Sequence, residues 1–136
     1  MMGTTENRAV AKRFIEEVFN NGNYDVIDDL VGRDFVAHLG GMQYGRDAFT
    51  EMIQSYRNGF PDYQCVIVDQ IAEGDQVATR WTFSGTQNGQ LMGMPPSGKR
   101  VTVTGVAIDR IAEGKLVESW LEMDAQRMLQ DLATAS

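Results

Sequence analysis

The first sixty residues carry apolar side chains at the spacing of amphipathic helices. Between Glu6 and Asn20 this spacing predicts a first helix, capped by Thr4 or Thr5 and ended before Gly22. The same spacing predicts a short helix over residues 26–31 and a third helix over 46–58. Between these two helices, residues 35–38 are typical of a short strand. The N-terminal part of the chain is therefore expected to be mainly helical.

From Pro61 onward the pattern changes to the alternation of apolar and polar residues that is typical of strands. It predicts four strands at about 63–72, 76–86, 99–112 and 115–123, with tight turns at 73–75 and 113–114. A Gly- and Pro-rich connection, 87–98, precedes the third strand, and a short helix over 124–132 follows the fourth. Helices followed by an antiparallel meander indicate the α+β class, and 136 residues fit a single domain over 1–136.

Composition and charge exclude several classes of function. The 12 Lys and Arg are scattered among 19 Asp and Glu, so the clustered basic face that nucleic-acid binding needs is missing. The longest uncharged stretch, 81–98, is too rich in Gly, Pro, Asn and Gln to span a membrane. The N-terminus lacks a signal-peptide pattern, so we expect a cytoplasmic protein. With one Cys and one His there is no Cys/His metal cluster, and we expect no metal and no cofactor.

One segment imitates a phosphate-binding motif. Residues 93–99 match the first seven positions of a P-loop, but Arg100 follows the lysine where the motif needs Ser or Thr. Pro95 and Pro96 also lack the backbone N–H groups that would bind phosphate. We therefore interpret the segment as a rigid connection with an apolar tip.

A few polar residues fall on elements that are otherwise expected to be buried. They are His38, Arg80, Thr82, Glu122 and Asp124. Alternation places Arg80 and Thr82 on one face of their strand and Trp81 on the other, but does not say which face is inside. Asp124 lies between the last strand and the last helix, where an aspartate is also a good helix cap.

Several short segments together resemble the SnoaL-like polyketide cyclases of the nuclear transport factor two-like superfamily. The segments are 35–38, 44–48, 60–62, 72–75, 80–82, 93–101 and 120–124. The resemblance implies a cone-shaped, curved antiparallel sheet wrapped around the N-terminal helices. It also implies an open apolar pocket for a small-molecule substrate and, usually, a homodimer.

The resemblance further implies a cofactor-independent cyclase or isomerase that closes a ring on an apolar carbonyl compound by an intramolecular aldol reaction. Asp124 matches the acid/base of the cyclases, and burial in an apolar pocket would raise the pKa of such a carboxyl group toward the working range. His38 matches a polar pocket position that could hold a carbonyl or an enolate. Arg80 and Thr82 would orient the substrate. The other candidate substrate-binding residues are Tyr56, Phe60, Phe83, Met92, Met94, Trp120 and Glu122.

Other activities of the same fold remain as alternatives. A related epoxide hydrolase would have a carboxylate two residues after the strand arginine, where this chain has Thr82. A hydroxylase and a small-molecule binding protein without turnover are the further alternatives, because the fold alone does not decide the activity.

Overall fold

The computed structural model describes residues 3–133, and its N-terminal part is helical as expected. The segments are α1 (Thr4–Arg13), η1 (Phe14–Asn20), η2 (Tyr24–Val26) and α2 (Ile27–Leu30). The first helix therefore spans the expected residues, but its second half, η1, is a π-helix. The expected cap is wrong: Gly3 occupies the N-cap position of α1, and no side chain caps it.

A hairpin and a long helix follow. Strand β1 (Val31–Leu39) begins directly after α2 and is longer than expected, and it turns through Gly40 and Gly41 into β2 (Met42–Gly45). Both glycines have positive φ values, 61° and 79°, which other residues rarely adopt. Helix α3 (Arg46–Gly59) then runs back along β1.

The rest of the chain forms the expected meander. Its strands are β3 (Gln64–Glu73), β4 (Gln76–Thr86), β5 (Arg100–Ala112) and β6 (Lys115–Met123), followed by α4 (Ala125–Ala133). Each of these strands pairs antiparallel with the next. The complete sheet has the order β2-β1-β6-β5-β4-β3, and β1 pairs with β6 in parallel. The α+β class is thus confirmed, although the sheet is mixed rather than wholly antiparallel.

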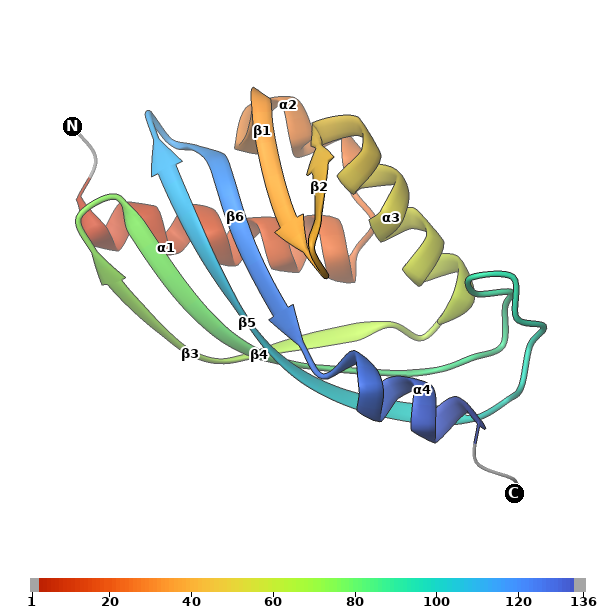
Figure 1. The fold of residues 1–136 in the computed structure, drawn as a ribbon. Helices are drawn as coiled ribbons and strands as arrows, with labels where there is room; N and C mark the ends of the chain where they lie inside the picture. Colours follow the sequence, from red (N-terminus) through yellow and green to blue (C-terminus); the bar gives the residue numbers. More distant parts are fainter. Residues whose placement is uncertain (1–2, 134–136) are drawn as a thin grey trace.

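The sheet is curved, and its concave face covers the core. Figure 1 shows the long strands β3, β4 and β5 bending beneath α1 and α3, with α4 at the far end of β5. Along β4 the odd-numbered residues are buried and face this core, Trp81 among them, whereas Arg80 is exposed on the convex face. This arrangement settles the orientation that alternation had left open.

The connection 87–99 is held together by the buried side chain of Gln87. Its amide nitrogen donates to the carbonyl oxygens of Gly89, Met94 and Pro95, and its Oε1 accepts from Ser97 Oγ at 2.7 Å. Lys99, the lysine of the P-loop-like segment, donates from Nζ to the carbonyl oxygen of Leu132 at 3.2 Å.

Candidate functional site

A small cavity lies between the concave face of the sheet and the helices. Its volume is about 70 Å³. The helices η1 and α3 and the strands β1 and β3–β6 all contribute to its wall. The lining residues are Phe14, Ile15, Phe19, Leu39, Phe49, Met52, Ile53, Tyr56, Tyr63, Cys65, Trp81, Phe83, Ala107, Asp109, Ser119, Leu121 and Met123. Among them, Asp109 alone carries a carboxyl group.

Asp109 is a buried acid in apolar surroundings. Only 6% of its surface is exposed, and Ser119, at 2%, donates a hydrogen bond from Oγ to Asp109 Oδ1. Burial raises the pKa of Asp109 to about 6, and the hydrogen bond from Ser119 acts in the opposite direction. Within residues 3–133 the other carboxylate oxygen, Oδ2, has no hydrogen-bond partner and is not fully enclosed, and Asp109 is part of the cavity lining.

The strand pairing brings these two residues together. Asp109 on β5 lies opposite Ser119 on β6 and opposite Val77 on β4. The inward positions of β5 are otherwise Val101, Val103, Gly105, Ala107 and Ile111. An aspartate in this apolar row is the sequence signal that identifies the site, and the sequence analysis missed it.

The helical wall of the cavity is fixed at the end of η1. Asn20 continues the edge of β3, accepting from the backbone N–H of Cys65 at 2.7 Å and donating to its carbonyl at 2.9 Å. Arg57 of α3 donates to the carbonyl oxygens of Phe19 and Asn20, both at 2.7 Å. These bonds satisfy carbonyls at the end of the helix and join three elements of the wall. The π-helical turn therefore has a fixed position relative to the cavity.

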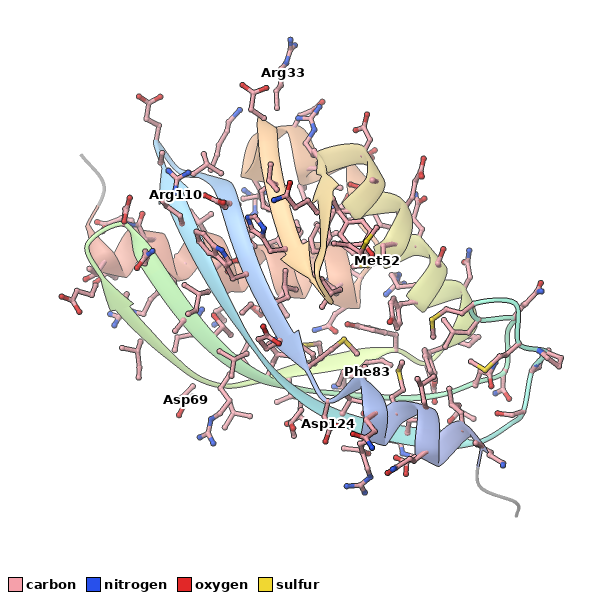
Figure 2. All side chains as sticks on the ribbon, in the orientation of Figure 1. Arg33, Met52, Asp69, Phe83, Arg110 and Asp124 are labelled. Atoms are coloured by element: carbon pink, nitrogen blue, oxygen red, sulfur yellow. The ribbon has the colours of Figure 1, made fainter. Side chains whose placement is uncertain are left out.

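Asp124, the expected acid/base, lies outside this cavity. It is exposed at the junction of β6 and α4 (Figure 2), and its Oδ1 accepts a hydrogen bond at 3.0 Å from the backbone N–H of Arg127. The expected burial of Asp124 is thus wrong, whereas its alternative role as a helix cap is confirmed. Asp124 reaches the surface because it follows Met123, the last inward-facing residue of β6, so alternation along the chain turns Asp124 to the outer side at the rim of the sheet.

The structure does bring several expected site residues together, but on the convex face. Arg80, Thr82, Glu122 and Asp124 line one open hollow there. Arg80 is bound to Asp69 through two hydrogen bonds of 3.1 and 2.9 Å, which explains its exposed position without a substrate. An aspartate at position 82 would also face this hollow rather than the inner cavity.

His38 lies on the convex face as well. Its Nε2 is 2.7 Å from Glu118 Oε2, and its ring stacks on Trp120 with 5.4 Å between the ring centroids. Arg110 donates to the other oxygen of Glu118 at 3.2 Å. His38 is therefore part of a surface ion-pair cluster, remote from the inner cavity.

The remaining expected wall residues separate into two groups. Tyr56 and Phe83 line the cavity. Phe60 and Met94 instead pack in the core, while Met92 is 60% exposed and Trp120 is on the outer face, so these four do not line the cavity. Burial of Phe60 is complete because it fills the space above Gly85, where a Cβ atom would lie 2.9 Å from the Phe60 Cβ.

Neither a metal-ligand cluster nor a membrane-spanning helix is present within the part of the chain that the structure describes. Across residues 3–133, no three His, Cys, Asp or Glu side chains converge as metal ligands. In the same part of the chain, no helix has the length and apolar character to cross a membrane.

Comparison with known proteins identifies the family. The SnoaL-like polyketide cyclase family matches residues 9–132. The chain belongs to this family. The nogalonic acid methyl ester cyclase of Streptomyces nogalater is 30% identical over 118 residues, which are 84% of this chain and 88% of that protein.

Solved structures of family members share the fold. IdmH of Streptomyces antibioticus is 28% identical, with a TM-score of 0.81 over 98% of this chain and all of that chain. A SnoaL-like polyketide cyclase of Agrobacterium tumefaciens is 17% identical, with a TM-score of 0.79 over 97% of this chain and all of that chain. The second likeness concerns the fold alone. The curved cone that the sequence resemblance implied is thereby confirmed.

Proposed function

We propose that this protein is a cofactor-independent cyclase that closes a ring on an apolar carbonyl compound, with Asp109 as the acid/base. The observation that carries the proposal is a carboxyl group with a pKa of about 6, buried in an apolar cavity. A general acid/base works best when its pKa lies near the working pH, because both protonation states are then populated. Membership of a family of polyketide cyclases supports the reaction class.

The proposed reaction is an intramolecular aldol closure. The Asp109 carboxylate removes a proton from a carbon next to an activating carbonyl group, and the C–H electron pair becomes part of an enolate. The enolate carbon then bonds to a second carbonyl carbon of the same molecule, whose oxygen becomes an alkoxide. Protonated Asp109 returns the proton to this alkoxide. No electrons are exchanged with an outside reagent.

The two neighbours of Asp109 suit this role. The hydrogen bond from Ser119 holds one carboxylate oxygen, so the other, Oδ2, remains available to the substrate. The surrounding apolar wall excludes water, which strengthens electrostatic interactions at the reacting carbons. Because ligand pockets usually have volumes of about 300–1,000 Å³, a cavity of about 70 Å³ must widen before a substrate enters. The side chains that must move are those of the wall.

The test uses the compound that the relative's name gives, nogalonic acid methyl ester. Wild-type protein is expected to cyclise it or a smaller diketo ester, and Asp109→Asn is expected to reduce kcat by about 10²–10⁴-fold. Asparagine still accepts the hydrogen bond from Ser119, so a loss of activity would not come from a loss of packing. Full turnover by the folded Asp109→Asn protein would refute the assignment.

We also propose that the protein forms a homodimer through the convex face of the sheet. Six apolar side chains on this face are each more than a third exposed: Val66, Val68, Ile71, Val106, Ile108 and Trp120. Burial of such a surface by a second copy removes apolar area from water. Sedimentation velocity is expected to show a dimer at micromolar concentration and a monomer for Ile108→Glu. A monomeric wild-type protein would contradict this proposal.

A further inference from the structure

Two tyrosines of the cavity wall have hydroxyl groups without a protein partner. Tyr56 lies in the last part of α3, and Tyr63 directly precedes β3; both line the cavity and both are half-buried. Within the described part of the chain neither hydroxyl takes part in a hydrogen bond, and neither is fully enclosed. Burial raises the pKa of Tyr56 and raises that of Tyr63 well above its ordinary value. Both are therefore protonated donors at neutral and mildly alkaline pH.

The ring of Tyr63 and the carboxyl group of Asp109 lie beside different parts of strand β4. The ring of Tyr63 packs on Phe83, with 4.4 Å between the centroids, whereas Asp109 pairs with Val77. Val77 and Phe83 are six positions apart on β4, which is about 20 Å when followed along the strand. Tyr63 therefore lies beside a different part of β4 from the residue that pairs with Asp109, and Tyr56 lies close enough to Tyr63 to raise its pKa.

Most of the remaining lining is apolar, although Trp81 carries an indole N–H. With Asp109 ionised and the Ser119 hydroxyl engaged, Tyr56 and Tyr63 supply the free hydroxyl donors of the lining. A ligand that covers a donor without offering it an acceptor costs free energy, and a ligand with a correctly placed oxygen avoids this cost. An apolar ligand without such an oxygen leaves both hydroxyl groups unsatisfied.

We propose that Tyr56 and Tyr63 form a subsite that binds a carbonyl or ether oxygen at the end of the substrate remote from Asp109. The subsite positions the substrate and selects molecules with an acceptor oxygen at that end. This inference rests on the proposed function in that the cavity is the substrate site, and it adds the residues that select the substrate's distal group.

The experiment is a binding cycle with two ligands that differ in one oxygen, 1-indanone and indane. Dissociation constants are measured at pH 8 by NMR titration of protein with ¹³C-labelled methionine methyl groups, because Met52 and Met123 line the cavity. At this pH Asp109 is ionised and cannot donate to the ketone. Wild type is compared with Tyr63→Phe, Tyr56→Phe and the double variant. Tyr24→Phe is the matched control, since Tyr24 packs against the core away from the cavity.

Removal of each hydroxyl that binds the ketone is expected to weaken 1-indanone binding by about 3- to 10-fold. Indane binding is expected to change by less than about 2-fold, and Tyr24→Phe is expected to alter neither constant. Equal changes for both ligands, no change for 1-indanone, or no binding of either ligand to wild type would overturn the subsite.

A second measurement separates this result from the proposed reaction. Turnover of nogalonic acid methyl ester by Asp109→Asn tests the acid/base and does not depend on the ligand pair. A loss of ketone selectivity with an unchanged pH profile of kcat supports the subsite. Selectivity that persists in the double variant refutes it, even if Asp109 is essential for turnover.

Discussion

Two aspartates of this protein lie on opposite sides of the same sheet, and their surroundings differ. Asp109 is buried on the concave face, where its one hydrogen bond comes from Ser119 and its pKa is raised to about 6. Asp124 is exposed at the rim, where its carboxylate caps the first turn of α4. The buried aspartate thus has a carboxyl group that can exchange a proton near neutral pH, whereas the exposed aspartate caps a helix.

Burial, more than position in a motif, therefore decides which carboxyl group can exchange a proton near neutral pH. Water stabilises the charged form of an exposed carboxylate, whereas an apolar cavity favours the neutral form. The convex hollow around Asp124 is open and also contains Arg80, which stays paired with Asp69. The residues that line the concave cavity around Asp109 include no Lys, Arg or His.

The largest expected effect separates the two aspartates by turnover. Asp109→Asn should lower kcat by about 10²–10⁴-fold, while Asp124→Asn should leave it within about 2-fold of wild type. Both substitutions keep the shape of the side chain and its ability to accept a hydrogen bond. Initial rates normalised to folded protein provide the measurement. A large loss of kcat in Asp124→Asn with little loss in Asp109→Asn would assign the acid/base to Asp124.

The next effect concerns stability and pH. The pKa of Asp109 is raised on folding, so the folded state binds more protons than the unfolded state between about pH 4 and pH 6. Stability is therefore fully present below about pH 4 and falls as the pH rises through 6, by on the order of 3 kcal/mol. Asp109→Asn should remove this loss and be the more stable protein at pH 8. Urea unfolding of wild type and of Asp109→Asn at pH 4 and at pH 8 gives the free energy of unfolding of each protein. If the two proteins differed by the same amount at both pH values, the expected cost of burying the charged carboxylate would be contradicted.

Ser119→Ala tests how the hydrogen bond from Ser119 affects the pKa of Asp109. The hydrogen bond from Ser119 lowers the pKa of Asp109, so its removal should raise that pKa further. The acid limb of the pH profile of kcat/KM should then move upward, because Asp109 must be ionised to remove a proton. A neutral-to-charged hydrogen bond contributes about 1.5–3 kcal/mol, so the shift should be about 1 pH unit or more. An unmoved limb would show that Ser119 does not bind the ionised form.

The smallest effect is on the outer aspartate. Asp124→Ala should cost about 1 kcal/mol of stability, since it removes the cap of α4, and Asp124→Asn should cost less. Thermal unfolding of the two variants at pH 7 tests this difference. A global loss of structure in Asp124→Ala would mean that the C-terminal helix carries much more of the stability than a single cap.

Much of the fold follows from the periodicity of the sequence. The strands β4 and β6 have the expected bounds, and α3 ends one residue after its expected end at residue 58. The short strand β2 was missed because four residues are too few for alternation to be a clear signal, and the strand depends on pairing with β1. The π-helical geometry of η1 was missed for a different reason: the apolar spacing is nearly the same for an α-helix.

The site was less predictable than the fold. Asp109 lies shortly before the turn at Gly114, and the sequence around it was interpreted as part of a hairpin. Its position in the inward-facing row of β5 was therefore overlooked. Its burial depends on which face of the sheet the helices cover, and this is decided by packing between elements that are distant in sequence. The convergence of Arg80, Thr82, Glu122 and Asp124 on one hollow was expected, but their location on the convex face depends on the direction in which the sheet curves.

The most direct test of the central claim is the pKa of the Asp109 carboxyl group itself. It is measured by ¹³C NMR titration of protein labelled at the aspartate side-chain carboxyl carbons, with the resonance assigned by Asp109→Asn. A midpoint of about 6 is predicted. A midpoint at or below about 4, the ordinary value for aspartate in water, would show that Asp109 is not held in an apolar cavity and would contradict its role as the acid/base.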